Sequence, residues 1–156
     1  NAMLECMKLV GAILIILGAA LAFANYLIGE SYPEQLLTWV KIAVESPVTF
    51  LLLLNLVLLV MGAVLEIYPA IVLGVPLILP LALSYGIHPA HLGVIFLTNM
   101  QLGFYLPPIG MSLVIAAFRF KQSVMTLVRA SLPFFLLLLG ALLLITYVPW
   151  LSLVWL

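Results

Sequence analysis

The sequence contains no aspartate, a single cysteine and few charged side chains of any kind. Its 156 residues carry five basic and five acidic groups, and the resulting net charge of zero argues against nucleic acid as a partner. Cys6 has no second cysteine to pair with, which excludes an intrachain disulfide and a cysteine-based metal site. The sequence shows no Ser/His/Asp or Cys/His set and no Gly-rich phosphate loop, so we expect neither an enzyme nor an organic cofactor.

Apolar residues make up most of the chain. They account for 67% of it, against roughly 45–50% in soluble domains, and the mean hydropathy is +1.41. Asn1 and Ala2 precede Met3, and we interpret residues 1–2 as a cloning scar. The apolar run from Leu9 to Ile28 is about 20 residues, longer than the roughly 7–15 of a signal peptide. The sequence therefore predicts an all-α integral membrane protein whose first transmembrane helix lies within residues 3–30.

An amphipathic arm helix is expected within residues 31–46, on the outer side of the membrane. Ser31 and Glu34 have the spacing of a capping box, and Trp39 suits the headgroup region. The apolar side of this helix is formed by Leu36, Leu37, Val40, Ala43 and Val44. A solvated linker helix is the alternative.

Residues 47–85 predict a helical hairpin whose tip contains Glu66. Its expected arms, Val48–Met61 and Ala70–Leu83, have 14 residues each, about 21 Å of helix, which is too short to span a membrane. A re-entrant hairpin satisfies these lengths, and the prolines of the second arm favour it because the carbonyls that they free need partners in protein. The alternative is a pair of arms of about 17–19 residues that just cross and place Glu66 on the far surface.

Residues 86–120 predict a discontinuous transmembrane helix, because the apolar run Leu92–Ala117 is interrupted at Gly103–Pro108. Arg119, Lys121 and Arg129 lie around a loop, residues 121–130, that the positive-inside rule places in the cytoplasm. Residues 131–156 hold the final transmembrane helix. The N-terminus then lies inside, and both ends of the hairpin lie outside.

Broken membrane helices are typical of secondary transporters, where the freed backbone groups bind ions or substrate. Carbonyls around Gly62–Leu65 and Met100–Leu106 are the expected cation ligands, and the half-helix N-termini near Pro69 and Pro107 are expected to face an anion. Glu66 is either part of this site or a solvated loop carboxylate, and Asn55 is as well explained by an interhelical hydrogen bond. His88 and His91 are interpreted as a turn and an interfacial histidine. The candidate ion- and substrate-binding residues are Gly62, Leu65, Glu66, Asn99, Gln101, Gly103, Leu106 and Pro107.

Six segments carry a family resemblance through their order along the chain: Met61–Ile71, Pro76–Pro80, Gly86–Gly93, Asn99–Gly110, Arg129–Phe134 and Leu144–Pro149. Together they resemble the C-terminal repeat of the large membrane subunit of TRAP transporters (tripartite ATP-independent periplasmic transporters). The resemblance implies an elevator-type carrier of two inverted repeats, in which sodium drives the uptake of organic acids such as C4-dicarboxylates or sialic-acid-like compounds. Leu106 stands where the family usually has Thr, and His88 where it often has Asp.

The resemblance implies a multi-pass protein of the bacterial inner membrane that works with other chains. Its expected partners are a small membrane subunit, a periplasmic solute-binding protein, the missing N-terminal repeat of the large subunit and membrane lipid, with self-association as a further option. Na⁺, held by backbone carbonyls near Gly62 and Gly103, is the expected coupling ion. The function expected is the C-terminal half of a sodium-coupled permease; the alternative is a non-transporting accessory subunit or a truncated remnant.

Overall fold

The computed structural model describes residues 2–65, 67–107 and 110–154, and the described residues form eight helices and no strand. Four of these helices are long and apolar enough to cross a membrane. They are α1 (Ala2–Gly29), α3 (Pro47–Val64), α4 (Ile67–Ser84) and α7 (Val124–Tyr147). The prediction of an all-α membrane protein is confirmed.

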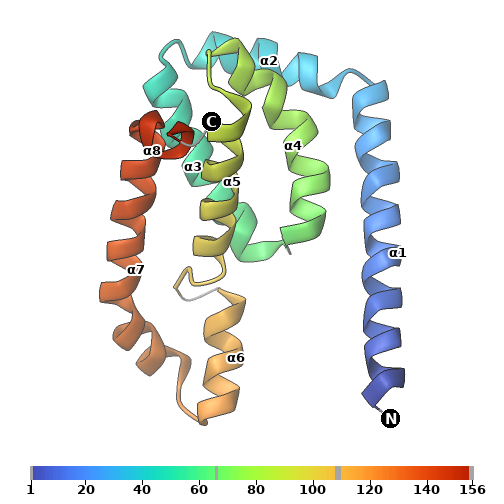
Figure 1. Cartoon of the computed structure of the whole chain (residues 1–156), viewed down its shortest axis with the longest axis vertical. Helices are drawn as coiled ribbons and strands as arrows, with labels where there is room; N and C mark the ends of the chain where they lie inside the picture. The colour runs from blue at the N-terminus through green and yellow to red at the C-terminus, as the bar shows by residue number, and fades with distance from the viewer. Residues whose placement is uncertain (1, 66, 108–109, 155–156) are drawn as a thin grey trace.

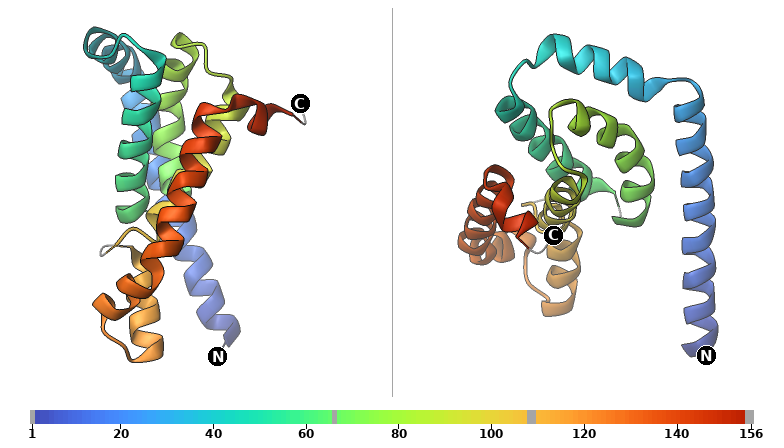
Figure 2. Two further views of the ribbon diagram at one scale, coloured as in Figure 1. Left: turned by 90° about the vertical axis from the view of Figure 1, so that its left-hand side faces the viewer. Right: turned by 45° about the horizontal axis from the view of Figure 1, so that its top comes forward.

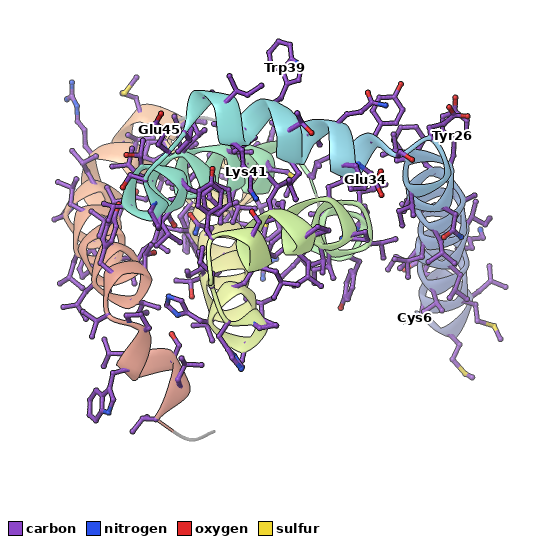
Figure 3. The ribbon with its side chains drawn as sticks, turned by 90° about the horizontal axis from the view of Figure 1, so that it is seen from above. Cys6, Tyr26, Glu34, Trp39, Lys41 and Glu45 are labelled. Carbon is purple, nitrogen blue, oxygen red and sulfur yellow. The ribbon has the colours of Figure 1, made fainter. Side chains whose placement is uncertain are left out.

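Helix α1 stands to one side and reaches the rest of the chain through α4 and through α2 (Tyr32–Ala43), which lies across the upper end of the molecule (Figure 1). Ala20 and Ala24, one turn apart on α1, are buried, and their small side chains let the helices approach closely. Seen from above, Trp39 points away from α4 and is 79% exposed (Figure 3). This exposed indole suits the headgroup region.

The core lies where α3, α4 and α5 (Pro89–Gly103) come together. Helix α3 packs mainly against α5 and touches α4 little, although α3 and α4 are joined by a short turn. The core is almost entirely aliphatic and aromatic, as expected for helices that must exclude lipid from their contacts. Its buried members on these three helices are Phe50, Leu54, Leu58, Ala70, Leu81, Ala82, Leu92, Ile95, Phe96 and Met100.

The second half of the chain runs through α5 and α6 (Met111–Phe120) to the lower end of the molecule and returns to the upper end through α7 (Figure 1). Helix α6 continues below α5 after a break, and α7 climbs back to the upper end, where α8 (Pro149–Leu153) follows (Figure 1). The start of α1 and the turn from α6 to α7 lie at the lower end. The end of α3 and the start of α4 lie between the two ends of the molecule, close to the level at which α5 ends (Figures 1 and 2).

Several expected helix boundaries differ from those in the structure. Each hairpin arm has 18 residues instead of 14, because Gly62 remains inside α3 and Pro69 lies in the first turn of α4, where a missing N–H breaks no helical bond. This length falls within the 17–19 residues of the alternative, spanning arms, so arm length does not favour a re-entrant hairpin. Helix α7 begins at Val124, within the expected loop of residues 121–130, since Ser123 caps it by accepting a hydrogen bond from the amide of Thr126.

The expected capping box at Ser31 is wrong. Ser31 has φ 59° and its side chain makes no capping hydrogen bond, so the turn from α1 into α2 is left-handed at this residue. A residue in that conformation does not direct its hydroxyl at the first amides of the helix as an extended N-cap residue does. Pro33, buried in the first turn, helps to start α2 instead.

Tyr85 joins three elements at the upper end of the hairpin. Its hydroxyl donates a hydrogen bond of 2.5 Å to the carbonyl oxygen of Val44, which follows α2. Its ring stacks on Phe50 in α3, with centroids 4.4 Å apart and an interplanar angle of 17°. This residue therefore fixes the end of α4 against the start of α3 and the end of α2.

The variant Tyr85→Phe keeps the stacked ring but leaves the Val44 carbonyl without its donor. We expect it to lower the free energy of unfolding by about 1 kcal/mol, measured by equilibrium unfolding in detergent micelles. Tyr26→Phe, at a position that is 59% exposed on α1, is the control and should change stability by less than about 0.5 kcal/mol. Equal losses for both variants would contradict the role given to the Tyr85 hydroxyl.

Candidate functional site

The backbones of α3 and α5 touch at two glycines. A Cβ atom on Gly62 would lie 2.9 Å from both the Cα and the carbonyl oxygen of Met100. A Cβ on Gly103 would lie 2.6 Å from the carbonyl carbon of Gly62. No side chain larger than hydrogen fits at either position without moving backbone, so the two glycines allow the closest helix approach in this part of the chain.

This contact brings two helix C-termini together. Helix α3 ends at Val64 and α5 ends at Gly103, each within two residues of the glycine contact. The last carbonyls of a helix carry a partial negative charge equivalent to roughly half an elementary charge. Two such ends at one place favour a bound cation more than either does alone.

The segment after α5 folds back on itself through its own backbone. The carbonyl oxygens of Met100, Leu102, Gly103 and Leu106 accept backbone N–H groups of the segment, and that of Phe104 accepts the N–H of Ser112 in α6. The break therefore frees fewer carbonyls than the sequence predicted. Each of these oxygens still has a second lone pair that can face a cation. A Cβ on Gly110 would clash with Phe104, so a glycine is also required where α6 begins.

A chain of buried polar side chains links α3, α5 and α7 beside the glycine contact. Asn99 Nδ2 donates to Asn55 Oδ1 at 2.6 Å, and Asn55 Nδ2 donates to Thr146 Oγ1 at 3.2 Å. Asn99 and Thr146 are fully buried, and Asn55 is 4% exposed. Asn55 thus makes an interhelical hydrogen bond, which was one of its two expected roles, and Asn99 packs within the protein.

Thr146 is the polar residue that the sequence analysis missed. It is the first hydroxyl after a long apolar run in the last membrane helix, and that isolation was the available signal. Its partner lies 91 residues away in the sequence, so the pairing itself could not be predicted.

The two histidines have different roles. His88 caps α5, since its Nδ1 accepts a hydrogen bond from the amide of Ala90. His91 was expected at the membrane interface, but it is buried at 3% exposure and its Nε2 lies 3.2 Å from the Thr146 carbonyl oxygen. That interpretation of His91 is wrong because the end of α7 covers it.

The remaining candidate residues are spread around the breaks. Leu65 follows α3 and is 36% exposed, and Leu106 and Pro107 are half-buried in the segment after α5. Gln101 is exposed on the side of α5 away from the buried asparagines. Glu66 and Pro108 lie outside the residues that the structure describes.

Gln101 lines a cavity of about 480 Å³ between the start of α4, the end of α5 and α7. Thr98 and Tyr105 add hydroxyls to its wall, and Ile67, the first residue of α4, borders it. The opposite wall, formed by Leu138, Ala141 and Ile145, is apolar. The volume is in the range of small-molecule sites, and the nearby N-terminus of α4 favours negative charge.

Comparison with protein families gives one extended match. The family model described as "Tripartite ATP-independent periplasmic transporter, DctM component" matches residues 1–151. The chain is 36% identical over 151 residues to the "C4-dicarboxylate TRAP transporter large permease protein DctM" of Pseudomonas aeruginosa, a match that covers 97% of this chain and 35% of that protein. No solved structure matches the chain.

Other relatives differ in how much of their length is matched. A "Putative dicarboxylate transporter subunit" of Paracoccus pantotrophus is 38% identical over 142 residues, which is 90% of this chain and 67% of that protein. The "Sialic acid TRAP transporter permease protein SiaT" of Haemophilus influenzae is 28% identical over 149 residues, which is 96% of this chain and 24% of that protein. The chain spans about a third of the length of the C4-dicarboxylate large permeases that it matches.

The two contact glycines provide a direct test of the site's geometry. Gly103→Ala should lower the free energy of unfolding in detergent by about 1–3 kcal/mol, because its Cβ meets backbone atoms that cannot move cheaply. Gly140→Ala in α7, where a Cβ meets nothing within 4 Å, is the matched control and should be neutral or stabilising by up to about 1 kcal/mol. A Gly103→Ala protein as stable as the Gly140→Ala protein would rule out the close contact.

Proposed function

Because the chain belongs to the DctM component family of the tripartite ATP-independent periplasmic transporters, we propose that it forms the C-terminal half of a sodium-coupled large permease subunit for organic acids. It is a membrane protein with several spanning helices and takes part in transport. The names of its relatives, which include C4-dicarboxylate and sialic acid permeases, support a carboxylate as the substrate class.

The observation that carries this proposal is the Gly62–Gly103 contact. It brings the C-terminal ends of α3 and α5 together. Sodium fits such a place because its ligands are oxygens and the two helix ends supply carbonyl oxygens and negative partial charge. In this arrangement the carbonyls around Gly62 and Gly103 hold the ion, and Leu106 contributes only backbone, since it lacks the hydroxyl of threonine.

The cavity beside Gln101 is the proposed place for part of the substrate. Gln101, Thr98 and Tyr105 supply polar groups, and the N-terminus of α4 supplies positive partial charge for a carboxylate. The apolar wall from α7 suits the carbon skeleton of an organic acid. The ion site and this cavity share α5, so sodium and substrate contact opposite sides of one broken helix.

The proposed assembly needs further chains. The match covers about a third of the large permeases, and long apolar faces of α1 and α7 are exposed in the described chain, with Ile15 at 74% and Leu137 at 69%. We propose that these faces meet the N-terminal repeat, a small membrane subunit and lipid in the inner membrane, while a periplasmic binding protein delivers substrate. The α3–α4 hairpin is proposed to be re-entrant, with its turn at the level of the α5–α6 break.

Sodium binding at the helix ends should stabilise the fold. In nanodiscs, NaCl should raise the melting temperature more than matched potassium or choline chloride, by the equivalent of about 2.7 kcal/mol at a hundred times the dissociation constant. Gly140→Ala should keep this difference, whereas Gly103→Ala should remove it because the Cβ displaces backbone at the contact. Equal stabilisation by all three salts would contradict the ion site.

Transport should require the complete assembly. Proteoliposomes that contain this chain, an N-terminal repeat, a small membrane subunit and a substrate-loaded binding protein should take up a labelled C4-dicarboxylate when a sodium gradient is applied, and this chain alone should not. Uptake by the chain alone would contradict the half-permease proposal. Absence of uptake from the complete assembly, with every chain present and folded, would favour a non-transporting accessory role.

A further inference from the structure

Asn99 on α5, Asn55 on α3 and Thr146 on α7 form a chain of hydrogen bonds. In this chain each side chain donates a hydrogen bond to the next group. Asn99 Nδ2 lies 2.6 Å from Asn55 Oδ1 and 2.8 Å from the carbonyl oxygen of Ile95, so both acceptors face the amide nitrogen. Turning the amide over would set its oxygen against two other oxygens, which fixes the orientation of Asn99. The Asn99 Oδ1 atom is therefore turned away from Asn55, and it has no hydrogen-bond partner among the described residues.

Asn55 is fixed in the same way. Its Nδ2 faces the Leu51 carbonyl oxygen at 2.9 Å and Thr146 Oγ1 at 3.2 Å, while its Oδ1 accepts from Asn99. The Thr146 hydroxyl has two acceptors within reach, the Leu142 carbonyl oxygen at 2.8 Å and Asn55 Oδ1 at 3.3 Å, and the shorter distance assigns its single proton to Leu142. The donors thus run from Asn99 to Asn55, to Thr146 and to the α7 backbone, and each bond polarises the next.

This polar chain lies close to the glycine contact along both helices. Asn99 is one turn before Gly103 on α5, and Asn55 is two turns before Gly62 on α3, so each pair shares one helix face. Leu58 on α3 and Met100 on α5, both fully buried, lie between the two contacts in the sequence of each helix. A slide of α3 along α5 by one residue, about 1.5 Å, would break the 2.6 Å Asn55–Asn99 bond and press the glycine backbones into their neighbours.

The same chain is where α7 joins this helix pair. The buried residues of α7 are Leu142 and Thr146, and Thr146 binds Asn55 through its hydroxyl and His91 through its carbonyl oxygen. The rest of α7 is half-buried or exposed among the described residues. The position of α7 therefore depends on the same asparagine that sets the register of α3 on α5.

We infer that Asn55 is a positioning residue for the cation site at the α3–α5 contact, an inference that rests on the proposed function. By holding Asn99, Asn55 fixes the register in which Gly62 meets Gly103, and with it the carbonyls that bind the ion. By holding Thr146, it links that register to α7. The cation also gives the free Asn99 oxygen an electrostatic partner on the helix that carries the site.

The test compares the sodium concentration at the midpoint of the thermal stabilisation curve, measured in nanodiscs. Asn55→Leu, close in volume but without the amide, should raise this midpoint roughly three- to tenfold. Leu58→Ala, one turn along at the same interface, is the control: it should lower the melting temperature without moving the midpoint. Thr146→Val should raise the midpoint in the same direction, and Thr146→Ser, which keeps the hydroxyl, should not.

The outcomes separate the inference from the function that it rests on. A sodium midpoint that stays at the wild-type value in both Asn55→Leu and Thr146→Val, with lower melting temperatures, would show a purely structural role and overturn the inference alone. A wild-type chain without any sodium-specific stabilisation would overturn the ion site itself and the inference with it. Should Asn55→Leu fail to fold, the Thr146→Val and Thr146→Ser pair decides the question.

Discussion

The contact of bare backbone between Gly62 and Gly103 is the constraint on which the rest of the structure depends. The end of a helix leaves its last carbonyl groups without intrahelical partners. Here the C-terminal ends of α3 and α5 lie against each other, so the carbonyls of the two ends share one environment. The turn into α4 and the folded segment before α6 both start from this point, which explains why the interruptions lie at one level (Figure 1).

The buried asparagines follow from the same contact. Helices that approach at glycine leave little room for large side chains, and two amides that bond each other fill the space while satisfying their polar groups. Among the described residues, Asn99 Oδ1 and His91 Nδ1 in this network and Ser152 Oγ in α8 have no hydrogen-bond partner, although buried polar atoms are usually paired. Of the three, Asn99 Oδ1 is the acceptor that lies one turn before Gly103 on α5.

The sequence predicted the helices better than their ends. Long apolar runs were sufficient for the membrane helices, because only a helix satisfies its own backbone in lipid. Gly62 and Pro69 were interpreted as helix ends, but tertiary contact keeps the glycine within α3, and the proline occupies a first turn that needs no N–H. The capping box failed because Ser31 takes a left-handed conformation that the residue pattern does not encode. The glycines of the site could be named from their position at the breaks; the direction of each amide, and the partnership with Thr146, depend on contacts between distant segments.

Helix α3 finds its main support in α5 and very little in α4, the helix to which it is joined. Because α5 comes later in the sequence, the ribosome releases α3 before the helix that it packs against has been made. Gly62 and Gly103 are separated by about forty residues, which take roughly 2 to 8 seconds to make at 5–20 residues per second. For that interval the first arm of the hairpin has its buried amide, Asn55, without the partner that later satisfies it. Helix α3 can therefore reach its final position only after α5, which follows it in the sequence, has also left the ribosome.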